Sequence, residues 1–366
     1  MEKTYLRGML LRPRGAEEAE IVVENGMIEE VYQGRSRGDP DGSVCEGLII
    51  PSLLDMHTHL GDWLARGDLP PGLEETVLPG GLKHKFLQGC QSSDLVRSVK
   101  GAISEVSPGV GMIMDYREGG LEGLRNLKEA LDPSSPVVFP LGRVNGSEPE
   151  DILGNSSGFG VPSLDQDGIH DLRKLALKKE KIFSVHASEL YREDAEKLVS
   201  LKPDQAVHMV SGTGSDWRAL AEENIPVTVC PRSNMAYDLE VPLHSMLNEG
   251  LSLTIGTDNS ISSRQDMFRE MEACWILLRR SRMEGENAAR EVFDMASGRN
   301  LKNTPLGNYI ERTIPIWGAD WPRKGDPAHL TCVDVKDPDI VKRSPFSYLV
   351  RFASQEDVLH TIRTWR

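Results

Sequence analysis

The chain has 366 residues and a formal net charge of −14, with 39% hydrophobic and 27% charged residues. This size and composition are typical of a globular protein with one large domain and a small second one. The negative charge argues against nucleic acid or an anionic membrane as a partner, but it leaves an anionic small substrate open. We expect no membrane span and no signal peptide, because no long apolar run is present. The five cysteines are scattered without a C-x-x-C pair, which predicts a reduced, cytoplasmic setting.

The two ends of the chain predict short strands. Residues 20–24 alternate loosely in polarity, Asn25-Gly26 is a strong turn signal, and residues 27–32 follow as a second strand. Together they predict a β-hairpin. Two further stretches of strand character lie near the other end, at 329–335 and 347–352. Neither end holds enough strands to complete a sheet alone, so we expect both ends to pair into one small β-domain.

Between these ends, short apolar runs alternate with helical patterns, which predicts βα units and a parallel sheet. The candidate strands are residues 47–50, 111–114, 136–140, 157–161, 182–185, 205–210, 226–230 and 251–256. Candidate helices cover residues 171–179, 191–201, 216–223 and 264–280. Eight such units suit an α/β fold of the TIM-like (β/α)₈ barrel type. The alternative fold is a doubly wound open sheet. Its dinucleotide-binding version is disfavoured, because no G-x-G-x-x-G motif follows the first strand.

We therefore expect the barrel domain at residues 51–304, inserted in a small domain formed by residues 1–50 and 305–366. In such a barrel all carboxyl ends of the strands open on one face, and that face carries the active site.

Residues that could perform chemistry follow several of the candidate strands. His57 and His59 follow the first long apolar run, and His186, His208 and Asp258 follow later ones. Because residues i and i+2 of a strand point to the same side, His57 and His59 are both expected to point into the barrel mouth. Neutral imidazole nitrogens suit zinc, iron or another borderline transition metal.

One H-x-H pair is a weak signal, and a single histidine after a strand is more often a satisfied core residue. The metal hypothesis therefore depends on several strand ends that carry coordinating groups in one barrel. His186 and Asp258 can complete a His₃Asp shell with the first pair and leave space for a water molecule. We expect the remaining histidines not to be ligands: His84, His170, His244, His329 and His360.

Four stretches around these residues resemble the amidohydrolase superfamily, in particular its branch of cytosine, guanine and adenosine-type deaminases and chlorohydrolases. They are residues 47–59 with the H-x-H pair, His186-Ala-Ser-Glu189, Cys230-Pro-Arg-Ser-Asn234 and Gly256-Thr-Asp-Asn-Ser260. The order of these motifs is far more specific than any one of them. The resemblance covers roughly residues 20–335, and it implies a TIM-like barrel flanked by a small β-sandwich formed by both termini.

The resemblance also implies a ligand set. His57, His59, His186 and Asp258 would bind a divalent metal ion, with zinc preferred and iron as the alternative. Binuclear members of the superfamily bridge two metals with a carboxylated lysine at a strand end. No lysine occurs at such a place within 136–145 or 157–165. We therefore expect one metal ion and no other cofactor.

The remaining roles define a reaction. Glu189 would carry a proton between the attacking water and a ring nitrogen of the substrate, and His208 would orient or polarise the hydroxide or the substrate. Asp258 would also act as the base that takes the proton of the water. A divalent ion lowers the pKa of its bound water to about 7. The expected activity is hydrolytic deamination of a purine, pyrimidine or pterin-type heterocycle by a metal-bound hydroxide.

Two alternatives stay open. One is hydrolysis of a cyclic amide or of another C–N or C–Cl bond. The other is a non-catalytic, metal-binding paralogue of the barrel enzymes, which is disfavoured because every ligand and Glu189 are present. The loop after His59 matches no deaminase pattern, so the small-molecule substrate is not predicted. The barrel helices leave room for a homodimer.

Some side chains are candidates for substrate contacts. Arg117 and Arg143 end predicted strands and could bind an anionic or carbonyl group, and Trp63 could stack on a heterocycle. The simpler expectation is that each cation near a strand end or early loop is solvated. This group of cations comprises Lys83, Lys85, Arg117, Arg143 and Arg232.

Overall fold

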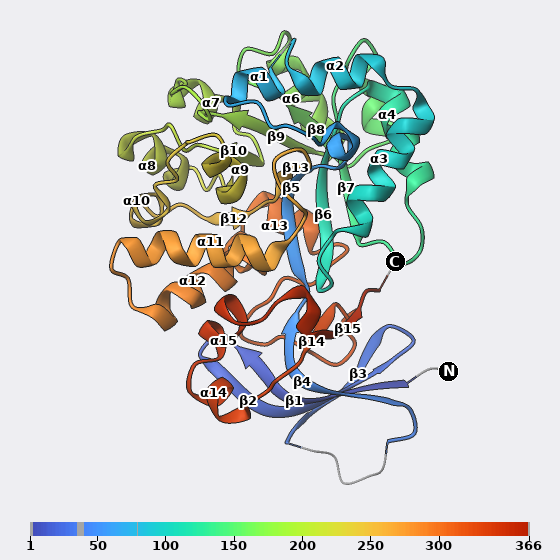
Figure 1. Ribbon diagram of the computed structural model, residues 1–366, viewed down its shortest axis with the longest axis vertical. Helices are drawn as coiled ribbons and strands as arrows, with labels where there is room; N and C mark the ends of the chain where they lie inside the picture. Colours follow the sequence, from blue (N-terminus) through green and yellow to red (C-terminus); the bar gives the residue numbers. More distant parts are fainter. Residues whose placement is uncertain (1–2, 35–39, 79, 365–366) are drawn as a thin grey trace.

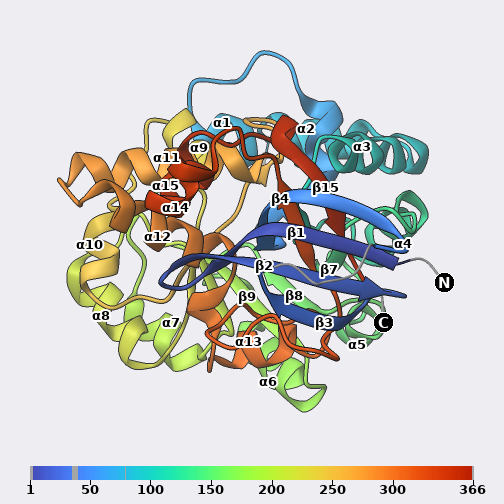
Figure 2. The same cartoon turned by 90° about the horizontal axis from the view of Figure 1, so that it is seen from below.

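Two sheets organise the protein in the computed structural model, which describes residues 3–34, 40–78 and 80–364. In Figure 1 the larger sheet and its helices form the upper part of the molecule, and the smaller sheet lies below. The N-terminal strands and the last strands of the chain meet in the smaller sheet, as the view from below in Figure 2 shows.

The larger sheet is parallel throughout. Its strands are β5 (Leu53–His59), β6 (Val110–Arg117), β7 (Val137–Gly142), β8 (Gly158–Val161), β9 (Ile182–Ala187), β10 (Gln205–His208), β11 (Val227–Val229), β12 (Leu253–Ile255) and β13 (Asp258–Asn259). β12 pairs with β11, and two residues later the chain continues as β13, which pairs with β5. β12 and β13 are thus halves of one interrupted strand that joins both edges of the sheet. The expected α/β barrel is confirmed.

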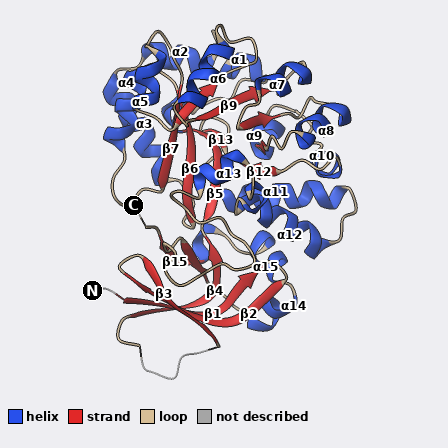
Figure 3. Ribbon diagram, turned by 180° about the vertical axis from the view of Figure 1, so that it is seen from behind, coloured by secondary structure: helices blue, strands red, loops and turns tan. Residues whose placement is uncertain are grey.

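Helices surround the barrel strands (Figure 3). They are α1 (Leu73–Val77), α2 (Leu82–Gly89), α3 (Ser92–Ser104), α4 (Gly120–Ala130), α5 (Pro149–Gly154), α6 (Ile169–Lys178), α7 (Ala195–Leu201), α8 (Gly214–Glu222), α9 (Pro231–Ala236), α10 (Leu243–Asn248), α11 (Met267–Arg280), α12 (Gly285–Ala296) and α13 (Pro305–Ile310). Short 3₁₀ helices occur at η1 (Leu60–Ala65), η2 (Arg299–Leu301) and η3 (Gln355–Asp357). The four predicted helices correspond to α6, α7, α8 and α11. No helix in the described part of the chain is long and apolar enough to cross a bilayer.

The smaller sheet has six strands in the order β15-β14-β4-β1-β2-β3. These are β1 (Lys3–Arg12), β2 (Gly15–Glu24), β3 (Met27–Gln33), β4 (Ser43–Pro51), β14 (Leu330–Val333) and β15 (Val358–Ile362). The predicted hairpin is present as the antiparallel pair of β2 and β3. Both ends of the chain contribute to this one sheet, whereas the second layer of a sandwich and the domain boundaries at residues 50 and 305 stay predictions.

One predicted strand lies in the other sheet, and another is a helix. Residues 47–50 belong to β4 of the smaller sheet, and the barrel begins only at Leu53. Only Pro51 and Ser52 separate the two apolar stretches at the point where the chain passes from one sheet to the other. Residues 347–352 lie largely in a helix, α15 (Pro345–Arg351), which follows α14 (Pro338–Arg343). Buried apolar residues at 346, 349 and 350 have helical rather than strand spacing.

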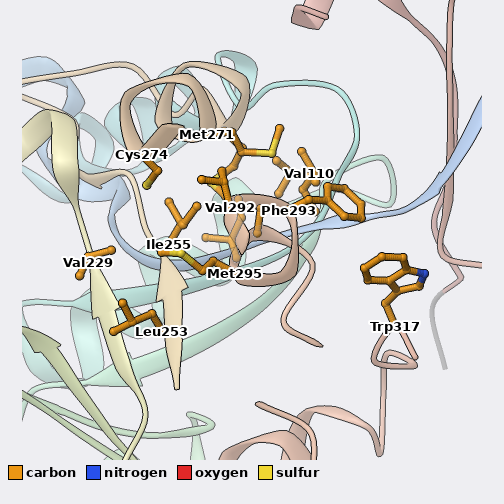
Figure 4. Close-up of a cluster of buried hydrophobic side chains, with 14 of the residues drawn as sticks. Val110, Val229, Leu253, Ile255, Met271, Cys274, Val292, Phe293, Met295 and Trp317 are labelled. Carbon is orange, nitrogen blue, oxygen red and sulfur yellow. The ribbon is translucent and has the colours of Figure 1, made fainter. Parts of the chain in front are cut away.

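A buried apolar cluster supports the interrupted strand from behind. Side chains of β11 and β12 pack against α11 and α12, as Figure 4 shows; the labelled members include Val229, Leu253, Ile255, Met271, Cys274, Val292, Phe293 and Met295. The rings of Phe293 and Trp317 meet edge to face with their centroids 5.0 Å apart. Both side chains are fully buried. This packing holds β12 in place, and Asp258 follows three residues after the end of β12.

We predict that Phe293→Ala lowers the free energy of unfolding by about 3–5 kcal/mol, because it removes a buried ring and leaves a cavity. Guanidinium unfolding followed by circular dichroism measures the loss. Ile276→Ala on α11 is the matched control, since Ile276 is 48% exposed and should change the stability by less than about 0.5 kcal/mol. Equal losses in the two variants would contradict this account of the core.

Candidate active site

The barrel brings the four predicted metal ligands together with His208. His57 and His59 lie on β5, His186 is near the end of β9, and His208 ends β10. Asp258 begins β13, where it pairs with Thr58 between the two histidines of β5. All five side chains therefore come from carboxyl ends of barrel strands.

Their ligand atoms converge on a small volume. One nitrogen each of His57, His59 and His186 lie within 4.8 Å of one another, and the same holds for atoms of His57, His208 and Asp258. Asp258 Oδ1 is 3.2 Å from His57 Nε2 and 3.7 Å from His59 Nε2. Three imidazoles with a carboxylate beside two of them are a donor set that suits zinc or iron.

Hydrogen bonds at the far side of two rings orient them for this role. His186 Nδ1 lies 3.0 Å from the carbonyl oxygen of Val161, and His59 Nδ1 lies 2.9 Å from Glu118 Oε1. Because both acceptors take a hydrogen from Nδ1, Nε2 of each ring stays free to bind a cation. His57 Nδ1 has no hydrogen-bond partner among the described residues. The residues present therefore fit a bound divalent ion.

Burial keeps the histidines unprotonated, as metal ligands must be. It lowers the pKa of His57 to about 4 and that of His59 to about 3, and it lowers the pKa of His186 well below its usual value. Burial also acts to raise the pKa of Asp258, but the hydrogen bond with His57 opposes this effect, and the pKa of Asp258 lies well below its usual range. At neutral pH the cluster therefore consists of neutral imidazoles and an ionised carboxylate.

Glu189 stands beside this cluster. Its Oε1 is 3.5 Å from His208 Nε2 and accepts a hydrogen bond of 3.3 Å from the Nδ2 of Asn234. Asn234 Nδ2 also lies 3.3 Å from His208 Nδ1, so the amide holds both side chains. Burial raises the pKa of Glu189 to about 7 although His208 opposes the shift. A carboxyl group with such a pKa can both hold and release a proton at neutral pH.

The backbone turns sharply where two of these residues project. His208 has a φ of 72° and Asp258 has a φ of 61°. Non-glycine residues rarely adopt this left-handed conformation, and such strain concentrates at functional sites. The two side chains thus project from sharp backbone turns at the end of β10 and at the start of β13.

Several residues of the site escaped the sequence analysis. Ser233 donates a hydrogen bond to Asp258 Oδ2, and Asp55 accepts hydrogen bonds from the backbone and the hydroxyl of Thr257. Ser233 and Asn234 belong to the C-P-R-S-N motif, which was the available signal for both. Glu118 had no signal beyond its place after a strand.

The expectation of solvated cations is wrong for Lys83, which is 3% exposed and lies against His59. It is also wrong for Arg117, which is equally buried and pairs with Asp115 at 3.0 Å. Lys85, in contrast, is exposed on the same helix as Lys83. Lys83 thus brings the segment after His59 back to the site. The spacing of residues in the sequence does not predict this contact.

A cavity of about 530 Å³ opens beside the ligand cluster. His59, His186, Glu189, His208 and Asp258 line its inner end, and residues of α1, α2 and the loops after β7 and β8 line the rest. Its volume is in the range of pockets that bind small molecules.

Of the three candidate substrate contacts, only Arg143 lines this cavity. Its Nε is buried without a hydrogen-bond partner among the described residues, and its terminal nitrogen is 3.7 Å from Glu118. Trp63 instead lies against Gly101 of α3, with the Arg66 guanidinium over its ring. Arg117 is engaged by Asp115. Neither Trp63 nor Arg117 lines the cavity, and their roles as substrate contacts stay predictions.

Comparison with known proteins identifies relatives along most of the chain. A protein of Methanothermobacter thermautotrophicus named as an aminohydrolase is 30% identical over 306 residues, which cover 74% of this chain and 77% of that protein. A 5'-deoxyadenosine deaminase of the same organism is 26% identical over an alignment that is 398 positions long with its gaps and covers 95% of this chain and 88% of the relative. No family model matches the chain.

Solved structures share the fold at lower identity. An adenosine deaminase from Xanthomonas campestris with bound zinc has a TM-score of 0.74 at 18% identity, and the match covers 97% of this chain and 90% of the other. A mutant of an atrazine chlorohydrolase from Arthrobacter aurescens, complexed with zinc and atraton, has a TM-score of 0.75 at 14% identity, with 98% and 95% covered.

We predict that His186→Gln reduces the bound zinc from about one ion per chain to a small fraction of that, because the shell loses one of its three imidazoles. Mass spectrometry of the metal content after dialysis against a weak chelator measures the change. His170→Gln is the control, since His170 is exposed on α6. Full zinc content in the His186 variant would remove this residue from the ligand set.

Proposed function

We propose that this chain, which belongs to the amidohydrolase superfamily of metal-dependent hydrolases, is an enzyme that removes an amino group from a heterocycle by hydrolysis. The observation that carries the proposal is the place of Glu189, beside the ligand cluster and facing the cavity. A carboxyl group with a pKa of about 7 at this place can protonate a ring nitrogen. The relatives named as an aminohydrolase and as a 5'-deoxyadenosine deaminase support the same reaction.

We propose that His57, His59, His186 and Asp258 hold one divalent ion. When bound, such an ion supplies a water-derived nucleophile at neutral pH. Zinc is preferred over iron because two structural neighbours contain zinc. No lysine occurs within 136–145 or 157–165, where binuclear members of the superfamily carry a bridging carboxylated lysine, and this supports a single ion.

The protein side chains would then divide the proton transfers. Hydrogen bonds from Ser233 and Asn259 hold Oδ2 of Asp258, so that its Oδ1 faces the histidines and can accept the proton of the attacking water. Glu189 would deliver a proton to the ring nitrogen next to the carbon under attack. Protonation of that nitrogen makes the ring carbon electrophilic, and the exocyclic amine then leaves as ammonia.

A second activity differs only in the leaving group. The chlorohydrolase among the structural neighbours favours hydrolysis of a C–Cl bond on a heterocycle as the alternative. Both reactions need attack of water on a ring carbon, and both would use the same ligand set. Release of ammonia rather than chloride distinguishes them.

We predict that the metal-loaded protein releases ammonia from at least one aminopurine, aminopyrimidine, pterin or nucleoside in a substrate panel. Glu189→Gln should lower kcat at least about 100-fold and leave the zinc content unchanged, because it removes the proton carrier but no ligand. Glu196→Gln, an exposed neighbour on α7, is the matched control. Silence of the zinc-loaded protein across the panel would contradict deamination, and full turnover by the Glu189 variant would contradict its role.

We also predict a substrate contact for Arg143. Because its buried Nε lacks a partner at the cavity wall, Arg143→Met should raise KM about 10–100-fold, the value of a hydrogen bond to a charged donor. Steady-state kinetics on the substrate found above measures this effect. Arg125→Met on the exposed side of α4 should leave KM unchanged. Equal KM values in the wild type and both variants would exclude Arg143 from substrate binding.

A further inference from the structure

The segment after His59 places a buried cation beside the metal-ligand cluster. Lys83 lies on α2, and its Nζ is 2.6 Å from Glu118 Oε1, 2.9 Å from Asp62 Oδ2 and 3.1 Å from His59 Nδ1. The side chains of Lys83, Asp62 and Glu118 are 4%, 0% and 9% exposed, respectively. A charge buried to this degree must be paired, so the three groups form one interdependent unit.

Glu118 is the centre of this unit. Its Oε1 meets both Lys83 Nζ and His59 Nδ1, the latter at 2.9 Å. An ionised carboxylate only accepts hydrogen bonds, so the hydrogen of the neutral His59 ring must lie on Nδ1, and Nε2 stays bare on the side of Asp258. If Lys83 donated to Nδ1 instead, the hydrogen would move to Nε2 and His59 could not bind a cation. Glu118 therefore selects the tautomer that can act as a ligand.

Lys83 in turn fixes Glu118. Nearby, Arg117 is already engaged by Asp115 at 3.0 Å, and the guanidinium of Arg143 is 3.7 Å from Glu118. Lys83 is thus the cation in closest contact with Glu118. Removing it would leave the carboxylates of Asp62 and Glu118 close together in a buried place without their shared counter-charge.

We propose that Glu118 and Lys83 are positioning residues for His59, and that Lys83 couples the α1–α2 segment to the metal centre. This inference rests on the proposed function only in taking His59 as a metal ligand. Leu73, Val77 and Leu78 of the same segment line the cavity. Such coupling is reciprocal, so docking of α2 raises metal affinity and bound metal stabilises the docked segment by the same factor.

The first test measures the dissociation constant of zinc by chelator competition. Glu118→Gln and Lys83→Met should each weaken zinc binding about 10–100-fold, which is typical for loss of a partner behind a ligand. Lys85→Met makes the same chemical change at an exposed position of α2 and should have no effect. In the double variant, Lys83→Met should add little to Glu118→Gln, because Lys83 acts through Glu118. Full additivity, or equal affinities of the Lys83 and Lys85 variants, would overturn the proposal.

The second test measures hydrogen exchange in residues 73–89 with and without zinc. Zinc should slow the exchange in the wild type and in Lys85→Met but not in Lys83→Met. Equal protection by zinc in all three proteins would overturn the coupling. If Lys83→Met does not fold, two other variants test the proposal. Lys83→Arg should retain the zinc affinity of the wild type within about tenfold. In Glu118→Gln, zinc should no longer slow the hydrogen exchange of this segment.

Both readouts are independent of turnover. A protein that shows the coupling but releases no ammonia would therefore contradict the deaminase and leave this inference standing. A wild type that binds no zinc would overturn the inference together with the metal centre.

Discussion

The closure of the barrel between its first and last strands is the constraint on which the site depends. β13 pairs with β5 so that Asp258 lies opposite Thr58, between His57 and His59. Asp55 secures this contact by accepting hydrogen bonds of 2.9 Å from the backbone of Thr257 and 2.6 Å from its hydroxyl. Burial raises the pKa of Asp55 to about 7, because an ionised carboxyl group is costly to bury. The two hydrogen bonds from Thr257 offset part of this cost. A shift of this register by one residue would turn Asp258 away from the histidines.

Beneath the ligands the barrel interior is polar rather than purely apolar. Tyr116 hydrogen-bonds Ser184, which donates to Gln205, and Gln205 donates to the carbonyl oxygen of Met56 at 2.9 Å. These contacts join β6, β9, β10 and β5 in one layer. The Tyr116 ring lies 4.3 Å from the His57 ring, centroid to centroid. A satisfied buried network is rigid, so the rings above it are held in position before any ligand arrives. Apolar packing around the outside of the sheet supports this layer.

The parts of the site that the sequence revealed are those whose direction a strand determines. The alternation of a strand places His57 and His59 on one side, and the common direction of barrel strands brings His186, His208 and Asp258 to the same face. Ion pairs that form only because a later helix packs back against the site could not be predicted from the sequence. Lys83 has an unremarkable sequence context, and its burial follows only from how α2 packs over Asp62 and Glu118. The helix α15 was missed because its short apolar stretch Tyr348-Leu-Val350 fits both periods until its packing is known.

The residues proposed for the reaction and the residues that line the cavity lie on different kinds of element. The barrel strands and the residues directly after them carry the proposed ligands and acid–base groups, whereas much of the cavity wall comes from α1, α2 and the loops after β7 and β8. Burial together with the positive charges of Lys83 and Arg143 lowers the pKa of His84 on this wall. Lys83 is balanced by Asp62 and Glu118, but the buried Nε of Arg143 has no such partner among the described residues. In the function proposed above, Arg143 would bind a hydrogen-bond acceptor of the substrate while the ring faces Glu189. Such a substrate would carry that acceptor at a distance from the reacting carbon.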